Sequence, residues 1–250
     1  MTTPWAAPLL ECTTCRSGAL GGEGDTQLVC DTCADVFPVA DGIARFQRDF
    51  DDYSENYDLI CEDDLARPKT PTVVKQVFSE LVTPRAKGIV CDVGCGDGYV
   101  LRRLSNERRI ALDIALPYLE ALPPEILRLW SRVENVPLRA RSVDTLICTD
   151  VLEHVLDPSA LATEIDRLVA TDGAALIAFP FEQDLSVYEL PEYRAKYAKY
   201  KYVHLRSIND ALIDELFPSF RIVFEQLITE GMPLMEFKPF PIKFLELRRR

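Results

Sequence analysis

Histidine is scarce in this chain, with 2 among 250 residues, and 40 acidic residues outnumber 28 Lys and Arg. The net charge of −12 argues against an extended nucleic-acid surface, because such surfaces neutralise phosphates with Lys and Arg. No apolar run approaches the roughly 20 residues of a membrane span, and the first residues lack the basic and apolar regions of a secretory signal. We therefore expect a cytoplasmic protein with no membrane partner.

The most informative segment is residues 90–98, which reads Val-Cys-Asp-Val-Gly-Cys-Gly-Asp-Gly. A short β-branched run leads into three glycines, and a helical pattern starts at Tyr99. A strand that turns into a helix through glycines lets a ligand lie against bare backbone. Asp113 ends the next apolar run, at the place where doubly wound folds hold a ribose diol. Together these features indicate an adenosine-type cofactor.

The glycine loop, Leu112-Asp113-Ile114 and the segment Ser142–Val155 resemble the class I S-adenosylmethionine (SAM)-dependent methyltransferases. The similarity runs from roughly Tyr53 to the C-terminus. It implies an α/β fold with a doubly wound, seven-stranded, Rossmann-like sheet over residues 50–250. An NAD enzyme is the main alternative for the loop, but it would be expected to show G-x-G-x-x-G. Here the third glycine comes one residue early.

The resemblance also implies which residues contact the cofactor. Asp92 is expected to position the amino end of the methionine, and Asp113 to accept hydrogen bonds from the ribose hydroxyls. Arg132 departs from the family pattern, because it replaces the Asp that usually accepts from the adenine amino group, and Glu134 is a candidate substitute. The full set of expected contacts is Tyr57, Asp92, Gly94, Cys95, Gly96, Asp113, Ile114, Val133, Glu134 and Thr149.

Asp150 and His154, which follow the expected fourth strand, are candidates for chemistry at the acceptor. His154 is a candidate base, since imidazole titrates near neutral pH; the alternative is a structural imidazole beneath the loop. Asp150 is a candidate wall of the acceptor pocket. The aromatic segment from Phe181 to Lys201 is the candidate for substrate selection, and packing of an amphipathic helix on the core is the alternative. Ser207 is the expected N-cap of a helix from Ile208 to Leu216.

Four of the eight cysteines have the spacing of a zinc site, with one C-x-x-C at Cys12 and Cys15 and a second at Cys30 and Cys33. The surrounding pattern, including residues 37–43, resembles small ribbon proteins that activate tRNA and protein methyltransferases, and ribbons fused in front of bacterial methyltransferases. We expect a zinc ribbon at residues 8–45 whose folding depends largely on the metal. The ribbon either recognises a substrate or partner, or acts as a structural clip.

These patterns predict an enzyme that transfers the methyl group of SAM to an O, N or C atom of a small-molecule acceptor. Methyl transfer needs no nucleophilic triad, because the sulfonium is already an activated electrophile. The sequence consequently leaves the acceptor open. The alternatives are methylation of rRNA or tRNA with the ribbon reading RNA, and a non-catalytic module that binds a partner. A homodimer is one option for the oligomeric state.

Overall fold

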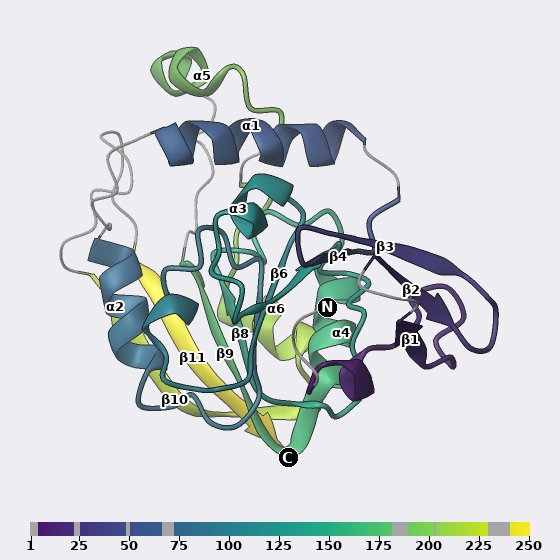
Figure 1. Cartoon of the computed structure of the whole chain (residues 1–250). Helices are drawn as coiled ribbons and strands as arrows, with labels where there is room; N and C mark the ends of the chain where they lie inside the picture. The colour runs from purple at the N-terminus through teal and green to yellow at the C-terminus, as the bar shows by residue number, and fades with distance from the viewer. Residues whose placement is uncertain are drawn as a thin grey trace.

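The computed structural model describes residues 5–22, 26–48, 51–66, 73–181, 190–202, 204–229 and 241–250. Eleven strands form one sheet, in the order β1-β2-β3-β4-β7-β6-β5-β8-β9-β11-β10 (Figure 1). The strands are β1 (Leu20–Gly22), β2 (Gln27–Cys30), β3 (Val36–Ala40), β4 (Ile43–Arg45), β5 (Val90–Val93), β6 (Arg109–Asp113), β7 (Leu127–Trp130), β8 (Val143–Thr149), β9 (Val169–Pro180), β10 (Phe220–Ile228) and β11 (Ile242–Arg249). The helices are η1 (Ala7–Leu9), α1 (Asp52–Ala66), α2 (Val73–Val82), η2 (Leu101–Arg103), α3 (Leu116–Glu120), α4 (Pro158–Leu168), α5 (Pro191–Tyr197) and α6 (Asp210–Leu216). None of them, in these described ranges, has the length and apolar character to cross a membrane.

In sheet order, the seven strands β7-β6-β5-β8-β9-β11-β10 form the doubly wound sheet that the sequence predicts. β5 lies between β6 and β8 and runs parallel to both. All of its residues are buried, as expected for a central strand with covered faces. β11 runs antiparallel between β9 and β10. Because the strand order reverses at β5, the loops at the carboxyl ends of β5 and β8 flank the position where such sheets bind ligands.

Helices cover the two faces of this sheet. Leu161 and Ile165 of α4, with Ile213 of α6, pack in one core cluster, whereas Val74 and Phe78 of α2 pack in the other. The long helix α1 crosses above the strand ends, with α3 beneath it (Figure 1). This arrangement places α1 over the edge of the sheet to which the glycine loop belongs.

Two helical predictions are wrong in detail. The helical pattern that starts at Tyr99 produces only the single 3-10 turn η2, because Leu104 is already extended and β6 begins shortly afterwards at Arg109. Helix α6 starts at Asp210, and its N-cap is Asn209 rather than Ser207. The amide oxygen of Asn209 accepts from the N–H of Leu212, which is the bond that an N-cap makes.

The predicted ribbon is built into the main sheet. β4 pairs in parallel with β7, so the ribbon strands cover an edge that would otherwise be exposed. Asp41 and Gly42 join β3 to β4 and have φ values of 53° and 74°, as in a type I′ turn. Arg128 of β7 is buried and donates to the carbonyl of Asp41 at 2.6 Å. The Asp-Gly pair therefore forms the turn and also docks the ribbon on β7.

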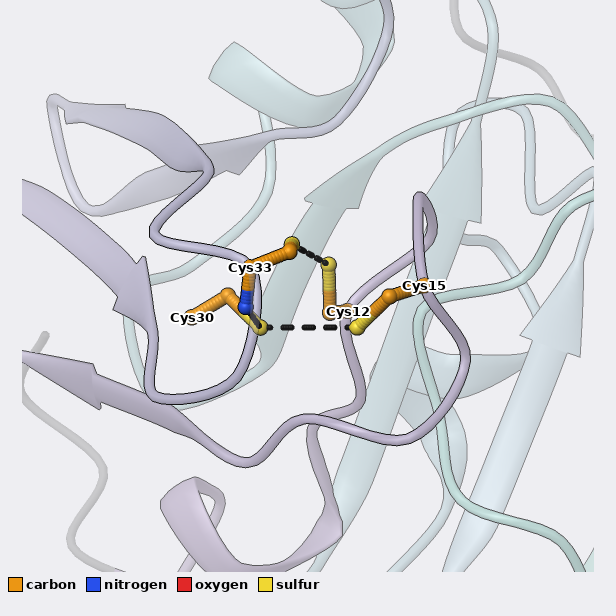
Figure 2. Close-up of side chains that lie close together, drawn as sticks. All are labelled: Cys12, Cys15, Cys30 and Cys33. Carbon is orange, nitrogen blue, oxygen red and sulfur yellow. Dashed lines mark hydrogen bonds between the residues drawn. The ribbon is translucent and has the colours of Figure 1, made fainter.

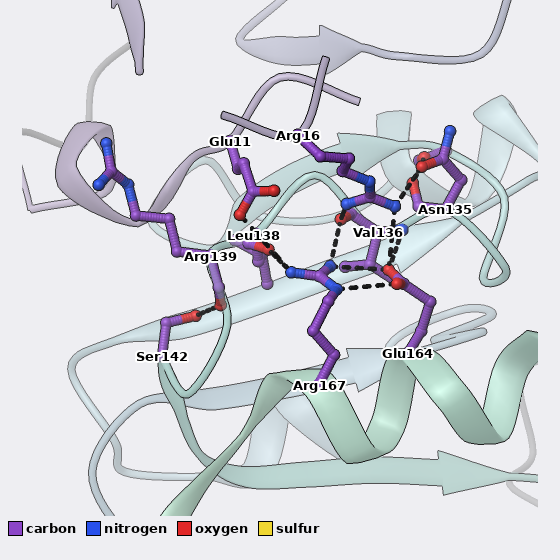
Figure 3. A network of polar contacts seen from close by, with 10 residues as sticks. Glu11, Arg16, Asn135, Val136, Leu138, Arg139, Ser142, Glu164 and Arg167 are labelled. Carbon is purple, nitrogen blue, oxygen red and sulfur yellow. Dashed lines mark hydrogen bonds and ion pairs between the residues drawn. The ribbon is translucent and has the colours of Figure 1, made fainter. Parts of the chain in front are cut away.

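A buried carboxylate, Glu164 of α4, joins the ribbon to the loop after β7 (Figure 3). Its Oε2 accepts from the N–H of Val136 at 2.8 Å and from Arg16 of the ribbon at 3.3 Å. Arg167 pairs with the same oxygen at 2.7 Å and also donates to the carbonyls of Val136 and Leu138. Ribbon, loop and helix are thus connected through one carboxylate.

We expect Glu164→Ala to lower the free energy of unfolding by about 3 kcal/mol, because two arginines then lose the buried charge that compensates them. Urea unfolding of the zinc-loaded chain measures this loss. Glu215→Ala removes an exposed glutamate of α6 and should change stability by less than about 0.5 kcal/mol. Equal stability of the two variants would contradict the assigned role of Glu164.

Candidate active site

Two adjoining cavities lie at the carboxyl ends of the central strands. Their volumes are about 390 Å³ and 220 Å³, and we call them the larger and the smaller cavity. The residues that line both are Ile60, Gly94, Gly96, Tyr118, Asp150 and His154. A concave site at this edge is the expected ligand position of a doubly wound sheet.

The structure brings every predicted cofactor and catalytic residue to these cavities. Besides the shared residues, the predicted ones that line the larger cavity are Asp92, Cys95 and Thr149. Those that line the smaller cavity are Tyr57, Asp113, Ile114, Val133 and Glu134. They come from α1, from the carboxyl ends of β5, β6 and β8, and from the loops after β5, β6, β7 and β8, so the fold assembles them. Their roles as ligands stay predictions.

The three glycines of the loop differ in what they do. Gly94, Gly96 and Gly98 have φ values of 76°, 51° and 66°, which favour glycine. A Cβ on Gly94 would lie 2.5 Å from Val151, and one on Gly98 would lie 2.3 Å from Leu122. A Cβ on Gly96 would meet nothing within 4 Å. The outer glycines therefore allow close packing, whereas Gly96 leaves open space at both cavities.

Asp113 connects the glycine loop to the loop after β6. Its two carboxylate oxygens accept from the N–H groups of Gly96 at 2.8 Å and Ala115 at 2.9 Å. Burial raises the pKa of Asp113 to about 6, although these hydrogen bonds favour the charged form. A carboxylate has about four acceptor positions, so about two remain for a ligand. Two neighbouring hydroxyl groups of a ligand could donate to these two remaining acceptor positions.

Asp92 is the second buried acid of the site and is 3% exposed. Its Oδ1 is buried and has no hydrogen-bond partner in the described part of the chain. Burial, together with the charges of Asp113 and Asp97, raises the pKa of Asp92 to about 8. A cationic ligand group beside Asp92 would favour its charged form, so this end of the larger cavity suits an ammonium group.

The unusual Arg132 lies at the outer side of the smaller cavity. Its guanidinium is 2.5 Å from Asp51 and 5.4 Å from the ring centroid of Tyr53. Glu134 also lines this cavity, and burial raises the pKa of its carboxyl group. Arg132 is therefore held by Asp51 and Tyr53, and the carboxyl of Glu134 is available as an acceptor beside Val133.

Sequence reasoning missed several polar residues of the larger cavity, among them Lys75 and Tyr118. Lys75 of α2 donates to Asp97 at 2.9 Å, and Tyr118 of α3 donates to Asp64 at 3.1 Å. Lys75 occupies a polar position of the amphipathic helix α2, so the sequence pattern does not distinguish it from a solvent-facing lysine. No local pattern distinguishes Tyr118, because α3 is a short helix whose position depends on the sheet.

The predicted substrate-selecting segment contributes Tyr200 to the larger cavity. Asn56 of α1 is buried; its side chain accepts from the N–H groups of Lys201 and Tyr202 and donates to the carbonyl of Tyr202 at 2.9 Å. This amide holds residues 200–202 against α1. Residues 182–189, with Tyr188, lie outside the described residues, as do the side chains of Tyr193 and Tyr197.

The four predicted metal ligands form a compact cluster in the ribbon (Figure 2). The Sγ atoms of Cys12 and Cys33 are 3.6 Å apart, as are those of Cys15 and Cys30. All four lie within 4.8 Å of one another, and none forms a disulfide. Tetrahedral zinc with Zn–S bonds of ~2.3 Å would separate its sulfur ligands by about 3.8 Å. The geometry therefore fits one zinc ion.

Residues 91–177 match the family described as a methyltransferase domain. A curated protein of Mycolicibacterium smegmatis, described as "Probable S-adenosylmethionine-dependent methyltransferase", is 28% identical over 111 residues. The match covers 42% of this chain and 42% of that protein, so it spans about two fifths of either length.

Solved structures share the fold at low sequence identity. A SAM-dependent methyltransferase from Anabaena variabilis has a TM-score of 0.59 at 16% identity and covers 85% of this chain and 100% of its own. A chain from the complex between the Haloferax volcanii Trm112 methyltransferase activator and a methyltransferase has a TM-score of 0.56 at 14% identity, covering 81% of this chain and 100% of its own. The [4+2]-cyclase SpnF has a TM-score of 0.58 at 12% identity, covering 78% and 94%. The chain thus has the class I methyltransferase fold, and residues 91–177 in its central part match the methyltransferase-domain family.

We expect Gly96→Ala to weaken binding of S-adenosylhomocysteine at least tenfold, because the new methyl group enters the space that the cavities share. A left-handed alanine should also cost roughly 1–2 kcal/mol of stability. Isothermal calorimetry measures the affinity. Gly21→Ala is the control, since a Cβ there meets only a carbonyl oxygen at 4.0 Å. Unchanged affinity in the Gly96 variant would place the ligand elsewhere.

Proposed function

We propose that this chain is a SAM-dependent methyltransferase that acts on a small molecule. The observation that carries the proposal is the meeting of the glycine loop with Asp92 and Asp113 at adjoining cavities beside the switch point of the sheet. The methyltransferase-domain match over residues 91–177 includes all three elements, and the relative from M. smegmatis supports SAM as the cofactor.

The residues present fit the parts of SAM. The remaining acceptor capacity of Asp113 suits the ribose hydroxyls, and the adenine would lie beside Val133 and Glu134 in the smaller cavity. The buried carboxyl of Asp92 suits the methionine ammonium in the larger cavity. SAM supplies a methyl group already activated on a sulfonium sulfur. The chain's contribution is to bind, orient and shield the reacting groups from water, for which α1 and its tyrosines are suitably placed.

The rest of the larger cavity is the proposed acceptor site. Its walls combine the cation of Lys75 with the phenol groups of Tyr118 and Tyr200. A cavity of this size and polarity suits a small polar molecule. The net charge of −12 supports the same choice, because RNA binding would require a concentration of basic side chains.

The proposal includes one zinc ion in the cysteine cluster and assigns the ribbon a supporting role. Arg16, the residue after Cys15, donates to the carbonyl of Val136 at 2.8 Å and to the side chain of Asn135. These residues directly follow Val133 and Glu134. The metal-bound ribbon would therefore hold the proposed adenine-binding loop in place, which supports the interpretation as a structural clip.

Two alternatives lead to different observations. Methylation of rRNA or tRNA, with the ribbon reading RNA, requires salt-dependent binding of RNA as well as SAM; the shared fold with the Trm112 complex is compatible with it. A non-catalytic module would bind neither SAM nor its demethylated product. The fold shared with SpnF, a cyclase, shows that the fold by itself does not determine the reaction.

Calorimetric titration of SAM and S-adenosylhomocysteine into the zinc-loaded chain tests the proposal. We expect binding to the wild type and a loss of at least 100-fold in Asp113→Ala, because two hydrogen bonds to a charged group are removed at ~1.5–3 kcal/mol each. Thermal unfolding of the variant controls for folding. Affinity equal to that of the wild type would refute the assignment of Asp113, and no binding to the wild type would favour the non-catalytic module.

The pKa of Asp92 generates a pH prediction. With a pKa of about 8, Asp92 is mostly protonated in the free protein at pH 7. A bound ammonium group favours the carboxylate, so binding should release close to one proton and strengthen several-fold from pH 7 to pH 8. Calorimetry in two buffers of different ionisation enthalpy counts the protons. Asp92→Asn should abolish the release, and persistence of the release in this variant would exclude Asp92 as its source.

A further inference from the structure

Both histidines of the chain lie in one cluster with a glutamate, separate from the cluster of Cys12, Cys15, Cys30 and Cys33. One ligand atom each of Glu153, His154 and His204 lies within 4.8 Å of the other two. His154 Nε2 is 3.8 Å from Glu153 Oε1, and the imidazole rings have centroids 4.8 Å apart at an angle of 80°. Two imidazole nitrogens and one carboxylate oxygen form a donor set that suits divalent first-row metals such as Mn²⁺, Fe²⁺ or Zn²⁺.

The fold holds these donors together although His204 is about fifty residues from Glu153 and His154 in sequence. Leu205 donates its N–H to the carbonyl of Glu153 at 2.8 Å, which fixes the backbone next to His204. Arg206 donates to the carbonyls of Leu152 and Val155 on either side. These hydrogen bonds hold the two segments side by side and bring the three ligand atoms together.

Asp150 provides an independent indication that a cation belongs here. Its Oδ1 is buried and has no hydrogen-bond partner among the residues that the structure describes. Its φ of 55° is a left-handed conformation that a non-glycine residue adopts at a cost. Asp150 interacts electrostatically with His204 and lines both cavities together with His154. A buried oxygen held in this way suits a further metal ligand, either direct or through water.

We infer that Glu153, His154 and His204, with Asp150 beside them, bind a divalent metal ion that holds the acceptor. An octahedral ion with three or four protein ligands keeps two or three free positions. Those positions match a molecule with two neighbouring oxygen atoms, at least one of them a hydroxyl. This narrows the acceptor class to catechol-like or vicinal-diol compounds and the methylated atom to oxygen.

The chemical consequence depends on the proposed methyltransferase function. A divalent ion lowers the pKa of a bound hydroxyl, so the proton leaves to water in the cavity. The oxygen then forms the new bond to the methyl carbon, and the bond from that carbon to the sulfonium sulfur breaks with its electron pair going to sulfur. His154 is a metal ligand in this scheme rather than a base.

Binding of Mn²⁺ to the zinc-loaded full chain tests the site, because Mn²⁺ binds most weakly in the divalent series and does not displace zinc from thiolates. Electron paramagnetic resonance measures the free ion directly. We expect one Mn²⁺ per chain and an affinity at least tenfold lower in His204→Gln and Glu153→Gln. Glu62→Gln, which changes an exposed glutamate of α1, is the matched control and should bind as the wild type does.

Calorimetry with S-adenosylhomocysteine on the same samples separates this inference from the proposed function. If the wild type binds S-adenosylhomocysteine but no Mn²⁺ at 1 mM, or if all variants bind Mn²⁺ equally, the metal site is wrong and the methyltransferase assignment is untouched. If the protein binds Mn²⁺ through His204 but does not bind S-adenosylhomocysteine, the metal site is supported. Its proposed role in methyl transfer is then refuted. His204 is only partly buried, so His204→Gln remains informative if Glu153→Gln does not fold.

Discussion

Hydrogen bonding of β5 to a parallel strand on each side brings the central candidate ligand groups of the two cavities together. Because β6, β5 and β8 run in the same direction, the glycine loop, Asp113 and Asp150 emerge at one edge of the sheet. The outer glycines then allow the loop to pack against Val151 and Leu122 without filling the space above Gly96. Helix α1 closes the site from above. The pairing of β5 with β6 and β8 thus determines the position of the site, and the contacts of the loops and of α1 determine its shape.

The electrostatic character of the site follows from the burial of several acids in a small volume. Asp92, Asp113 and Asp150 each have a pKa raised mainly by burial. The cations among the cavity-lining residues that the structure describes include Lys75 and Arg132, and each is paired with an aspartate, Asp97 and Asp51 respectively. A site of this kind favours ligands that bring positive charge. SAM carries both a sulfonium and an ammonium group, and a divalent ion beside Asp150 would act in the same direction. The proposed cofactor and the inferred metal ion would therefore both compensate the negative charge of the buried acids.

Local chemistry could be predicted from the sequence, and long-range pairing could not. The glycine loop, Asp113 and the cysteine spacing are recognisable because each function needs particular residue types at short, fixed separations. The pairing of β4 with β7 and the burial of Glu164 depend on segments far apart in the chain, and no local pattern records them. The helix expected after Tyr99 shows the opposite error, because a helical pattern was present but the backbone is already extended at Leu104 and forms only one 3-10 turn before it. Likewise, His154 and His204 meet only in the folded chain.

Because the ribbon is part of the main sheet, it supports the loop after β7 from within the same chain. The Trm112 activator of H. volcanii is found in a complex with a methyltransferase, and two separate chains associate to a degree that depends on their concentrations. Here β4 and β7 belong to one polypeptide, so their pairing is intramolecular and independent of dilution. The ribbon also cannot be shared among several enzymes or withdrawn from this one by competition. Support of the loop after β7 is consequently a permanent property of each molecule.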